Sequence, residues 1–292
     1  MATTRRSARF ALTGHSGAEL TLIETDGQTF VRKRASAPEQ SARLRQQCDK
    51  LQAAHAAGIS CPAVYRTDDS DRYFSFDMEF IPGDSLAHAV TSGREPDWDT
   101  LLPQITDLTA RYCATSDGEI PALQFVEKLD AVVAGCAANP AAHQDLTRIG
   151  GAVAALKEHN WSGLPASQSH GDLTFENLLV RQDGRIVFID FDVPDQSSWW
   201  LDIAKLFQDL FGHWCLRHLV LADPEGIEAL NAQLAMSRAA ATVAVRLAET
   251  IPGGPDRLAP LVAFHLLRTL PYARTPFVVD YVLRRVAAVL EP

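Results

Sequence analysis

The stretch His170–Leu179, which reads HGDLTFENLL, combines residue types that can carry chemistry. Asp172 follows a histidine by two positions, and the carboxamide of Asn177 follows Asp172 by five. Further along, Asp190 ends the apolar run Val187–Ile189. Carboxylate and amide oxygens are the ligands that Mg²⁺ prefers, and another carboxylate beside such a cation can accept a proton from a hydroxyl. The pattern therefore predicts a metal site with a general base next to it.

A hairpin would bring two of these side chains together. The segments 178–181 and 185–189 are strand-like, and Asp183-Gly184 between them is a favoured two-residue turn. Counted outward from that turn, Asn177 pairs with Asp190, and cross-strand partners have Cβ atoms roughly 4.5–5.5 Å apart. Both could then bind one divalent cation, with Asp172 beside it in the loop that leads into the hairpin. A base next to a pair of metal ligands is typical of enzymes that catalyse phosphoryl transfer. In these enzymes most of the catalysis comes from positioning the reactants and neutralising their charge.

The elements that must position these residues fall into two regions. The run LTLIETDGQTFVRK contains two β-rich segments around Asp26-Gly27, which is again a hairpin signal. Pro38–Ala57 has helical periodicity, and Tyr73–Ile81 is a further strand ended by Pro82-Gly83. Beyond that break the chain is mainly helical. The pattern predicts an α+β fold with a small N-lobe and a larger helical C-lobe, over residues 1–82 and 83–292.

Composition excludes several classes of protein. The chain has 292 residues and a net charge of −9, from 36 acidic and 27 basic residues, which argues against a nucleic-acid-binding surface. Five widely spaced cysteines form no C-x-x-C pair, so neither a zinc site nor a disulfide framework is indicated. No run approaches the ~18 consecutive apolar residues of a membrane span. We expect a soluble cytoplasmic protein that binds small molecules.

The spacing H-x-D-x₄-N, followed by an aspartate at the end of a strand, resembles the aminoglycoside phosphotransferase and choline kinase family of protein-kinase-like enzymes. Gly171 stands where protein kinases have the arginine of H-R-D, and Asp190-Phe191-Asp192 replaces D-F-G. The resemblance covers most of residues 10–210 and implies a bilobal protein-kinase-like fold that uses ATP and Mg²⁺. The implied roles are Asp172 as catalytic base, Asn177 and Asp190 as metal ligands, and His170 and Asp202 as supports of the catalytic loop.

The same resemblance indicates how a nucleotide would be bound. FVRK resembles the strand whose lysine, here Lys33, binds the nucleotide phosphates. Strand alternation places Val31 and Lys33 on the same face of the sheet. MEFIPG resembles the hinge whose backbone holds adenine, which assigns that role to Glu79, Phe80 and Ile81. No G-x-x-x-x-G-K-[ST] motif occurs, which excludes a P-loop kinase.

Two other parts of the nucleotide site carry a weaker signal. Gly14 and Gly17 in TGHSGAE would form a loop over the phosphates, although an ordinary turn explains two glycines equally well. A helix residue is expected to pair with Lys33, and a glutamate would be usual there. We assign this role to Asp49, sixteen residues after Lys33, with the glutamines at positions 46 and 47 as alternatives that would act by hydrogen bonding.

These features predict an ATP-dependent phosphotransferase that moves the γ-phosphoryl group to a hydroxyl of a small molecule. The resemblance favours a sugar or sugar derivative, because HGDLTFENLL with LDIAKLFQDL is closer to bacterial phosphotransferases of that kind than to antibiotic-inactivating ones. An aminoglycoside or a choline-like amino alcohol is the alternative acceptor. A nucleotide-binding regulator without turnover is a further alternative, disfavoured because Asp172, Asn177 and Asp190 are all present.

Overall fold

The computed structural model describes residues 8–12, 18–25, 27–69, 72–248 and 257–290. The chain divides into two compact units, the first comprising Met1–Gly83 with Leu179–Pro194 and the second Asp84–Leu178 with Asp195–Pro292. The first unit thus takes in a segment around the predicted hairpin that lies beyond the division expected at residue 82.

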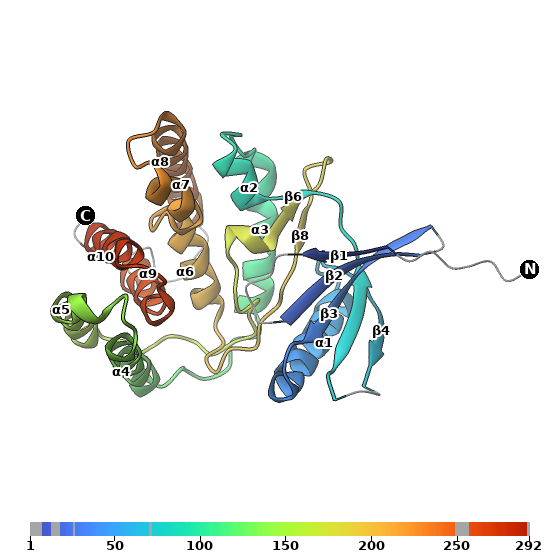
Figure 1. Ribbon diagram of the computed structural model, residues 1–292, viewed down its shortest axis with the longest axis horizontal. Coiled ribbons are helices and arrows are strands. Elements are labelled where there is room, and N and C mark those ends of the chain that lie inside the picture. Colours follow the sequence, from blue (N-terminus) through green and yellow to red (C-terminus); the bar gives the residue numbers. More distant parts are fainter. Residues whose placement is uncertain (1–7, 13–17, 26, 70–71, 249–256, 291–292) are drawn as a thin grey trace, which may run out of the picture. The chain divides into compact units, whose positions relative to one another are not determined.

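The first unit contains a five-stranded antiparallel sheet with the strand order β1-β2-β3-β5-β4 (Figure 1). Thr25 of β2 pairs with Gln28 of β3, so the first predicted hairpin has its two-residue turn, with Gly27 at a φ of 76°. Helix α1 follows β3 after a short 3₁₀ turn, η1. The bounds are β1 (Ala8–Leu12), β2 (Ala18–Thr25), β3 (Gln28–Ala35), η1 (Pro38–Gln40), α1 (Ser41–Ala56), β4 (Val64–Asp68) and β5 (Ser75–Glu79).

Strand β3 has the alternation expected of a sheet with one buried face. Val31, Lys33 and Ala35 are buried, with exposed fractions of 8%, 4% and 2%, whereas Arg32 and Arg34 are only partly buried. Lys33 pairs with Leu20 of β2 and Phe76 of β5, so it lies in the middle of the sheet. The expectation that Val31 and Lys33 share a face is confirmed.

The second hairpin, between β7 (Leu178–Val180) and β8 (Ile186–Phe188), has a different turn from the predicted one. The Arg181 amide donates to the Arg185 carbonyl at 2.9 Å, and the Gly184 amide donates to the Arg181 carbonyl at 3.0 Å, with Gly184 at a φ of 78°. These bonds define a three-residue loop, Gln182–Gly184, of the type in which a turn is followed by a left-handed glycine. The prediction of a two-residue turn is wrong, and the register shifts by one residue.

This shift removes the register argument that placed Asn177 opposite Asp190. Asn177 ends a 3₁₀ turn, η3 (Phe175–Asn177), instead of extending β7. Asp190 has a φ of 58°, a left-handed conformation that is uncommon for a residue other than glycine. Asp183 accounts for the longer loop, because its carboxylate accepts hydrogen bonds from both the backbone amide and the side chain of Arg185.

The second unit is mainly helical, as expected, and begins with the short strand β6 (Asp84–Ser85). Helices α6 and α9 are buried along most of their length and pack against each other, and α9 also packs on α10 (Figure 1). The helices are α2 (Leu86–Thr91), α3 (Trp98–Cys113), α4 (Ala122–Ala138), α5 (Leu146–Lys157), α6 (Trp199–Leu210), α7 (Arg217–Ala222), α8 (Ile227–Ala248), α9 (Leu258–Leu267) and α10 (Pro276–Leu290). None of the helices within the described ranges combines the length and apolar character needed to cross a membrane.

Candidate active site

The nucleotide-binding lysine predicted on β3 is held by two partners within the first unit. The Lys33 Nζ atom donates to Gln47 Oε1 at 3.1 Å and forms an ion pair with Asp190 Oδ1. The Lys33 side chain is 5% exposed, whereas that of Asp190 is 33% exposed. A buried ammonium is stable only when it is paired, so Asp190 and Gln47 together hold the lysine in place.

The helix partner of Lys33 is Gln47, and the assignment of Asp49 to that role is wrong. Gln47 is buried on the face of α1 that also carries Leu44, Cys48 and Leu51, whereas Asp49 is exposed. Two positions along a helix correspond to about 200° of rotation, which turns Asp49 away from the sheet. Of the two glutamines considered as alternatives, Gln47 is therefore the correct one.

The amide of Gln47 also binds the second aspartate of the Asp190-Phe191-Asp192 segment. Gln47 Nε2 donates to Asp192 Oδ1 at 2.8 Å, and Arg43 Nη2 donates to Asp192 Oδ2 at 2.7 Å. Lys50 donates to the Asp192 backbone carbonyl. Although burial acts to raise the pKa of the Asp192 carboxyl, the hydrogen bonds from Arg43 and Gln47 lower it below its usual value. Asp192 thus attaches helix α1 to the segment that carries Asp190.

The residues assigned to adenine binding lie at the end of β5. Glu79 is the last residue of the strand; its amide donates to the Ala63 carbonyl at 2.8 Å, and its carboxylate accepts from the Ala63 amide at 3.3 Å. Phe80 is 38% exposed and Ile81 is buried at 7%. Gly14 and Gly17 lie outside the described residues. Adenine binding at Glu79–Ile81 remains a prediction.

The catalytic loop in the second unit is anchored through its backbone to helix α6. Asp202 accepts hydrogen bonds from the amides of His170, at 2.5 Å, and Gly171, at 2.8 Å. Gly171 has a φ of 96°, a conformation that residues with a side chain rarely adopt. The buried His170 accepts a hydrogen bond at Nδ1 from the Asp172 amide at 3.3 Å. These contacts agree with supporting roles for His170 and Asp202.

Asp172 and Asn177 are brought together by the turn between them. Asn177 Nδ2 donates to the backbone carbonyl of Asp172 at 2.8 Å and to its carboxylate Oδ2 at 3.0 Å. The other carboxylate oxygen, Oδ1, lies 3.1 Å from Nζ of Lys205. Both oxygens of the predicted base are therefore bound by nitrogen donors, which fixes the orientation of the carboxylate.

Two further residues of α6 contact the catalytic loop, and the sequence interpretation missed both. Lys205 binds Asp172, and Asp209 accepts hydrogen bonds from the amides of Phe175 at 2.7 Å and Cys215 at 2.9 Å. With Asp202, they are spaced by three and four positions, so all three lie on one helix face. Helical periodicity counted from Asp202 is the signal that could have found them.

The carboxyl of Asp209 is fully buried. Burial raises its pKa to about 7, while the hydrogen bonds from Phe175 and Cys215 act in the opposite direction. The two amide donors match an ionised carboxylate, so the contacts stabilise the charged form against the cost of burial. This aspartate is a structural link between the catalytic loop and the 3₁₀ turn η4 (Trp214–Leu216).

The donor atoms suit a hard cation. The amide group of Asn177 turns its NH₂ toward Asp172, which leaves its carbonyl oxygen as the atom that can bind a metal. Asp190 supplies a second, partly exposed carboxylate on the first unit. An amide oxygen and a carboxylate are ligands typical of Mg²⁺, so both side chains are chemically suited to the predicted cation.

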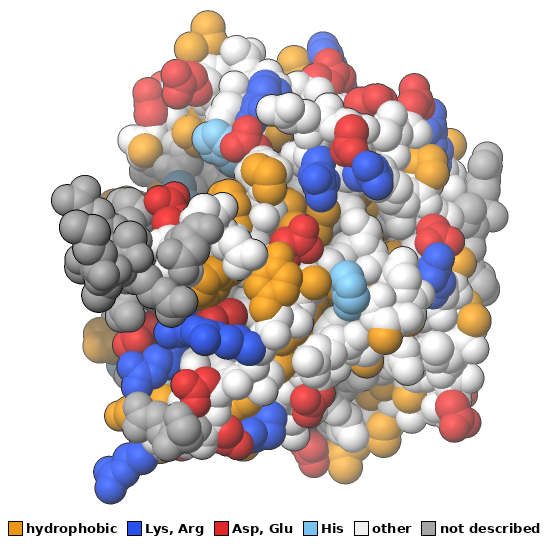
Figure 2. All heavy atoms as spheres, turned by 90° about the vertical axis from the view of Figure 1, so that its right-hand side faces the viewer, with side chains coloured by type: hydrophobic (Ala, Val, Ile, Leu, Met, Phe, Trp, Pro, Cys, Tyr) orange, Lys and Arg blue, Asp and Glu red, His pale blue; other side chains and the backbone are white. Residues whose placement is uncertain are grey.

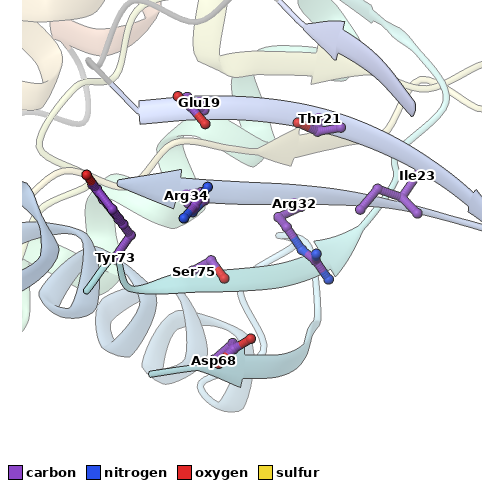
Figure 3. A pocket seen from close by; sticks show the side chains of 8 residues that line it. All are labelled: Glu19, Thr21, Ile23, Arg32, Arg34, Asp68, Tyr73 and Ser75. Carbon is purple, nitrogen blue, oxygen red and sulfur yellow. The ribbon is translucent and has the colours of Figure 1, made fainter. Parts of the chain in front are cut away.

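A polar groove of about 340 Å³ lies on the face of the first sheet that is opposite to Lys33 (Figure 3). Its lining includes Arg32 and Arg34, which alternate with Lys33 along β3. Arg32 pairs with Asp77 at 2.6 Å, and Arg34 stacks on Tyr73 with 4.8 Å to the ring centre. On the face drawn in Figure 2, basic side chains likewise lie close to acidic ones. The groove is thus a surface of paired side chains, separate from the predicted chemistry.

Residues 12–248 match the model of the phosphotransferase enzyme family, and the chain belongs to this family. The match confirms the class expected from the catalytic loop, a small-molecule phosphotransferase, and the solved kinases that resemble the chain confirm the expected protein-kinase-like fold. No curated protein sequence matches the chain significantly.

Several solved structures share the fold at low sequence identity. The choline kinase LicA from Streptococcus pneumoniae has a TM-score of 0.60 at 14% identity, covering 98% of this chain and 94% of that chain. The aminoglycoside phosphotransferase APH(3'')-Id from Streptomyces rimosus has a TM-score of 0.60 at 19% identity, covering 90% and 92%. A Haemophilus somnus protein provisionally named fructosamine-3-kinase has a TM-score of 0.56 at 16% identity, covering 99% and 92%.

Proposed function

We propose that this phosphotransferase moves the γ-phosphoryl group of ATP to a hydroxyl of a sugar or sugar derivative. The observation that carries the proposal of phosphoryl transfer is the set of contacts that holds the Asp172 carboxylate in place. Its carboxylate is bound at one oxygen by Lys205 and at the other by Asn177, on a loop whose backbone is bound by Asp202. Such a fixed, partly exposed carboxylate suits a general base that orients an acceptor hydroxyl and takes its proton.

In this proposal Lys33 binds the nucleotide phosphates, the backbone at Glu79–Ile81 binds adenine, and Gly14 and Gly17 belong to the loop over the phosphates. The pairing of Lys33 with Gln47 and Asp190 supports its part, because it holds the ammonium in one place before a nucleotide arrives. Structures of the relatives also support a nucleotide, since LicA has been solved with AMP and APH(3'')-Id with ADP and streptomycin.

Asn177 and Asp190 would hold Mg²⁺, through the amide oxygen of the first and the carboxylate of the second. When bound, the cation would neutralise charge on the phosphates during transfer. Asp192 is not assigned to the metal, because Gln47 and Arg43 bind both of its carboxylate oxygens, whereas the ion pair of Asp190 with Lys33 involves Oδ1.

The sugar acceptor rests on the LTFE sequence within the catalytic loop and on the presence of a fructosamine-3-kinase-named protein among the relatives. A coupled assay of ADP release with Mg·ATP tests the proposal on a panel of sugars, polyols, amino alcohols and aminoglycosides. We expect turnover on a sugar that Asp172→Asn lowers at least about a hundredfold, in line with the loss of a general base, with ATP affinity retained. Turnover that survives this substitution contradicts the role of Asp172. Magnesium-dependent ATP binding without transfer to any acceptor identifies a regulator instead of a kinase.

A further inference from the structure

Lys205 places a positive charge directly beside the proposed base. Its Nζ atom lies 3.1 Å from Asp172 Oδ1, and the two side chains are 21% and 36% exposed. The pair is therefore neither buried in the core nor fully open to solvent. A hydroxyl that binds at Asp172 must approach this ammonium closely, because the two groups share one carboxylate.

The other carboxylates of this region are already bound. Asp202 accepts two backbone amides of the catalytic loop, and Asp209 accepts those of Phe175 and Cys215. Glu176 forms an ion pair with Arg217 at 3.3 Å. Within the described part of the catalytic loop and α6, each carboxylate thus has a partner in the protein. The charge of Asp172 itself, the carboxylate at which an acceptor hydroxyl would bind, is offset by the ammonium of Lys205.

We propose that Lys205 determines acceptor specificity, by excluding molecules with a positively charged amine next to the transferred hydroxyl and by favouring neutral sugars and polyols. This inference rests on the proposed function, since it takes Asp172 as the base. An ammonium carries three N–H donors, so Lys205 can bind Asp172 with one and donate another to a neighbouring hydroxyl of a diol. A second ammonium in that position meets like-charge repulsion, which is strong in a partly desolvated site.

Matched acceptor pairs test the inference. Each pair differs only in an amine replacing a hydroxyl next to a potential acceptor hydroxyl, as in glucose with glucosamine and glycerol with 3-amino-1,2-propanediol. We expect wild-type kcat/KM to be at least about tenfold higher for the hydroxyl member. A difference of this size is what moderate repulsion between two like charges, the Lys205 ammonium and the acceptor amine, would produce. Lys205→Met should reduce this preference by about tenfold or more, mainly through a lower KM for the amine member, because it removes the charge and keeps the length of the side chain.

Two control variants separate charge from structure. Lys205→Arg keeps the positive charge and should retain the preference, whereas Lys157→Met removes a partly exposed lysine that pairs with Asp130 and should leave the preference unchanged. If Lys205→Met does not fold, Lys205→Gln gives the same comparison, and melting temperatures identify a purely structural effect.

The possible results are distinct. A wild-type enzyme that prefers the amine members overturns the inference while leaving the phosphotransferase function intact. An unchanged preference in Lys205→Met and Lys205→Gln also overturns the inference and leaves the phosphotransferase function intact. Loss of the preference in a folded Lys205→Arg protein has the same meaning. If ATP binds but wild-type protein phosphorylates neither member of any pair nor any other acceptor, the proposed function itself fails, and the inference fails with it.

Discussion

The ammonium of Lys33 is bound to the amide oxygen of Gln47 at 3.1 Å, so a neutral side chain occupies the helix position where a glutamate would be usual. The same amide donates from its nitrogen to Asp192 at 2.8 Å. Glutamine can make both contacts because it carries an acceptor and a donor, whereas a glutamate would present only acceptors. The positive charge of Lys33 is balanced instead by Asp190.

Gln47→Glu is therefore expected to destabilise the protein, although it installs the more usual residue. The new carboxylate would face Asp192 without a hydrogen to donate, so the free energy of unfolding should fall by about 1–3 kcal/mol. Urea unfolding measures this change, with Gln46→Glu on the exposed face of the same helix as the control, expected to stay within about 0.5 kcal/mol.

Adding Asp192→Asn to Gln47→Glu restores a donor at the contact. The double variant should be more stable than the sum of the two single changes indicates, because the two residues touch. Strictly additive effects, or a neutral Gln47→Glu, would contradict the donor role of Gln47.

Much of this site follows from the sequence, and the exceptions have physical causes. The alternation of β3 placed Lys33 correctly, since burial of one sheet face leaves little choice of orientation. The spacing of Asp49 from Lys33 favours it as the helix partner, but the direction of a side chain on a helix depends on its phase, which selects Gln47. An Asp-Gly dipeptide precedes the second strand of both hairpins, yet Thr25 pairs with Gln28 in the first hairpin whereas the second has a three-residue loop, so the dipeptide alone does not determine the register.

Asp202→Asn should loosen the catalytic loop without removing any proposed catalytic group. One of the two backbone amides of His170 and Gly171 would then face an NH₂ group in place of an oxygen. We expect a loss of about 1.5–3 kcal/mol in stability, typical of hydrogen bonds to a charged group, and a fall in kcat larger than the change in ATP affinity. Asp107→Asn, which breaks an exposed pair with Arg111 on α3, is the matched control. Unchanged kcat in a folded Asp202→Asn protein would show that the loop is held by other contacts.

Gly184→Ala tests the turn found between β7 and β8. Gly184 has a φ of 78°, where a Cβ atom is strained, so alanine should lower the free energy of unfolding by about 1 kcal/mol. Gly151 offers the opposite case, since it lies exposed within α5 and an added Cβ would meet no atom within 4 Å. Gly151→Ala should therefore raise stability by roughly 0.5–1 kcal/mol. Chemical denaturation of both variants measures the contrast, and equal effects of the two substitutions would exclude the left-handed turn.

His213 is expected to make stability depend on pH. Burial, followed by the positive charge of Arg285, lowers its pKa to about 3, and its backbone is left-handed with a φ of 51°. In the unfolded chain the imidazole titrates near 6.5. As the pH falls from about 6.5 toward 3, the unfolded state takes up a proton that the folded state does not, so stability present above pH 6.5 is lost.

His213→Asn keeps a residue that tolerates the left-handed region and removes the group that takes up this proton. Unfolding free energies measured between pH 4 and 7 should fall less steeply for the variant, by up to about 1.4 kcal/mol per pH unit, with His143→Asn as a control for loss of an exposed histidine from the same unit. Parallel curves for wild type and His213→Asn would show that His213 binds its proton equally well in the folded and unfolded states.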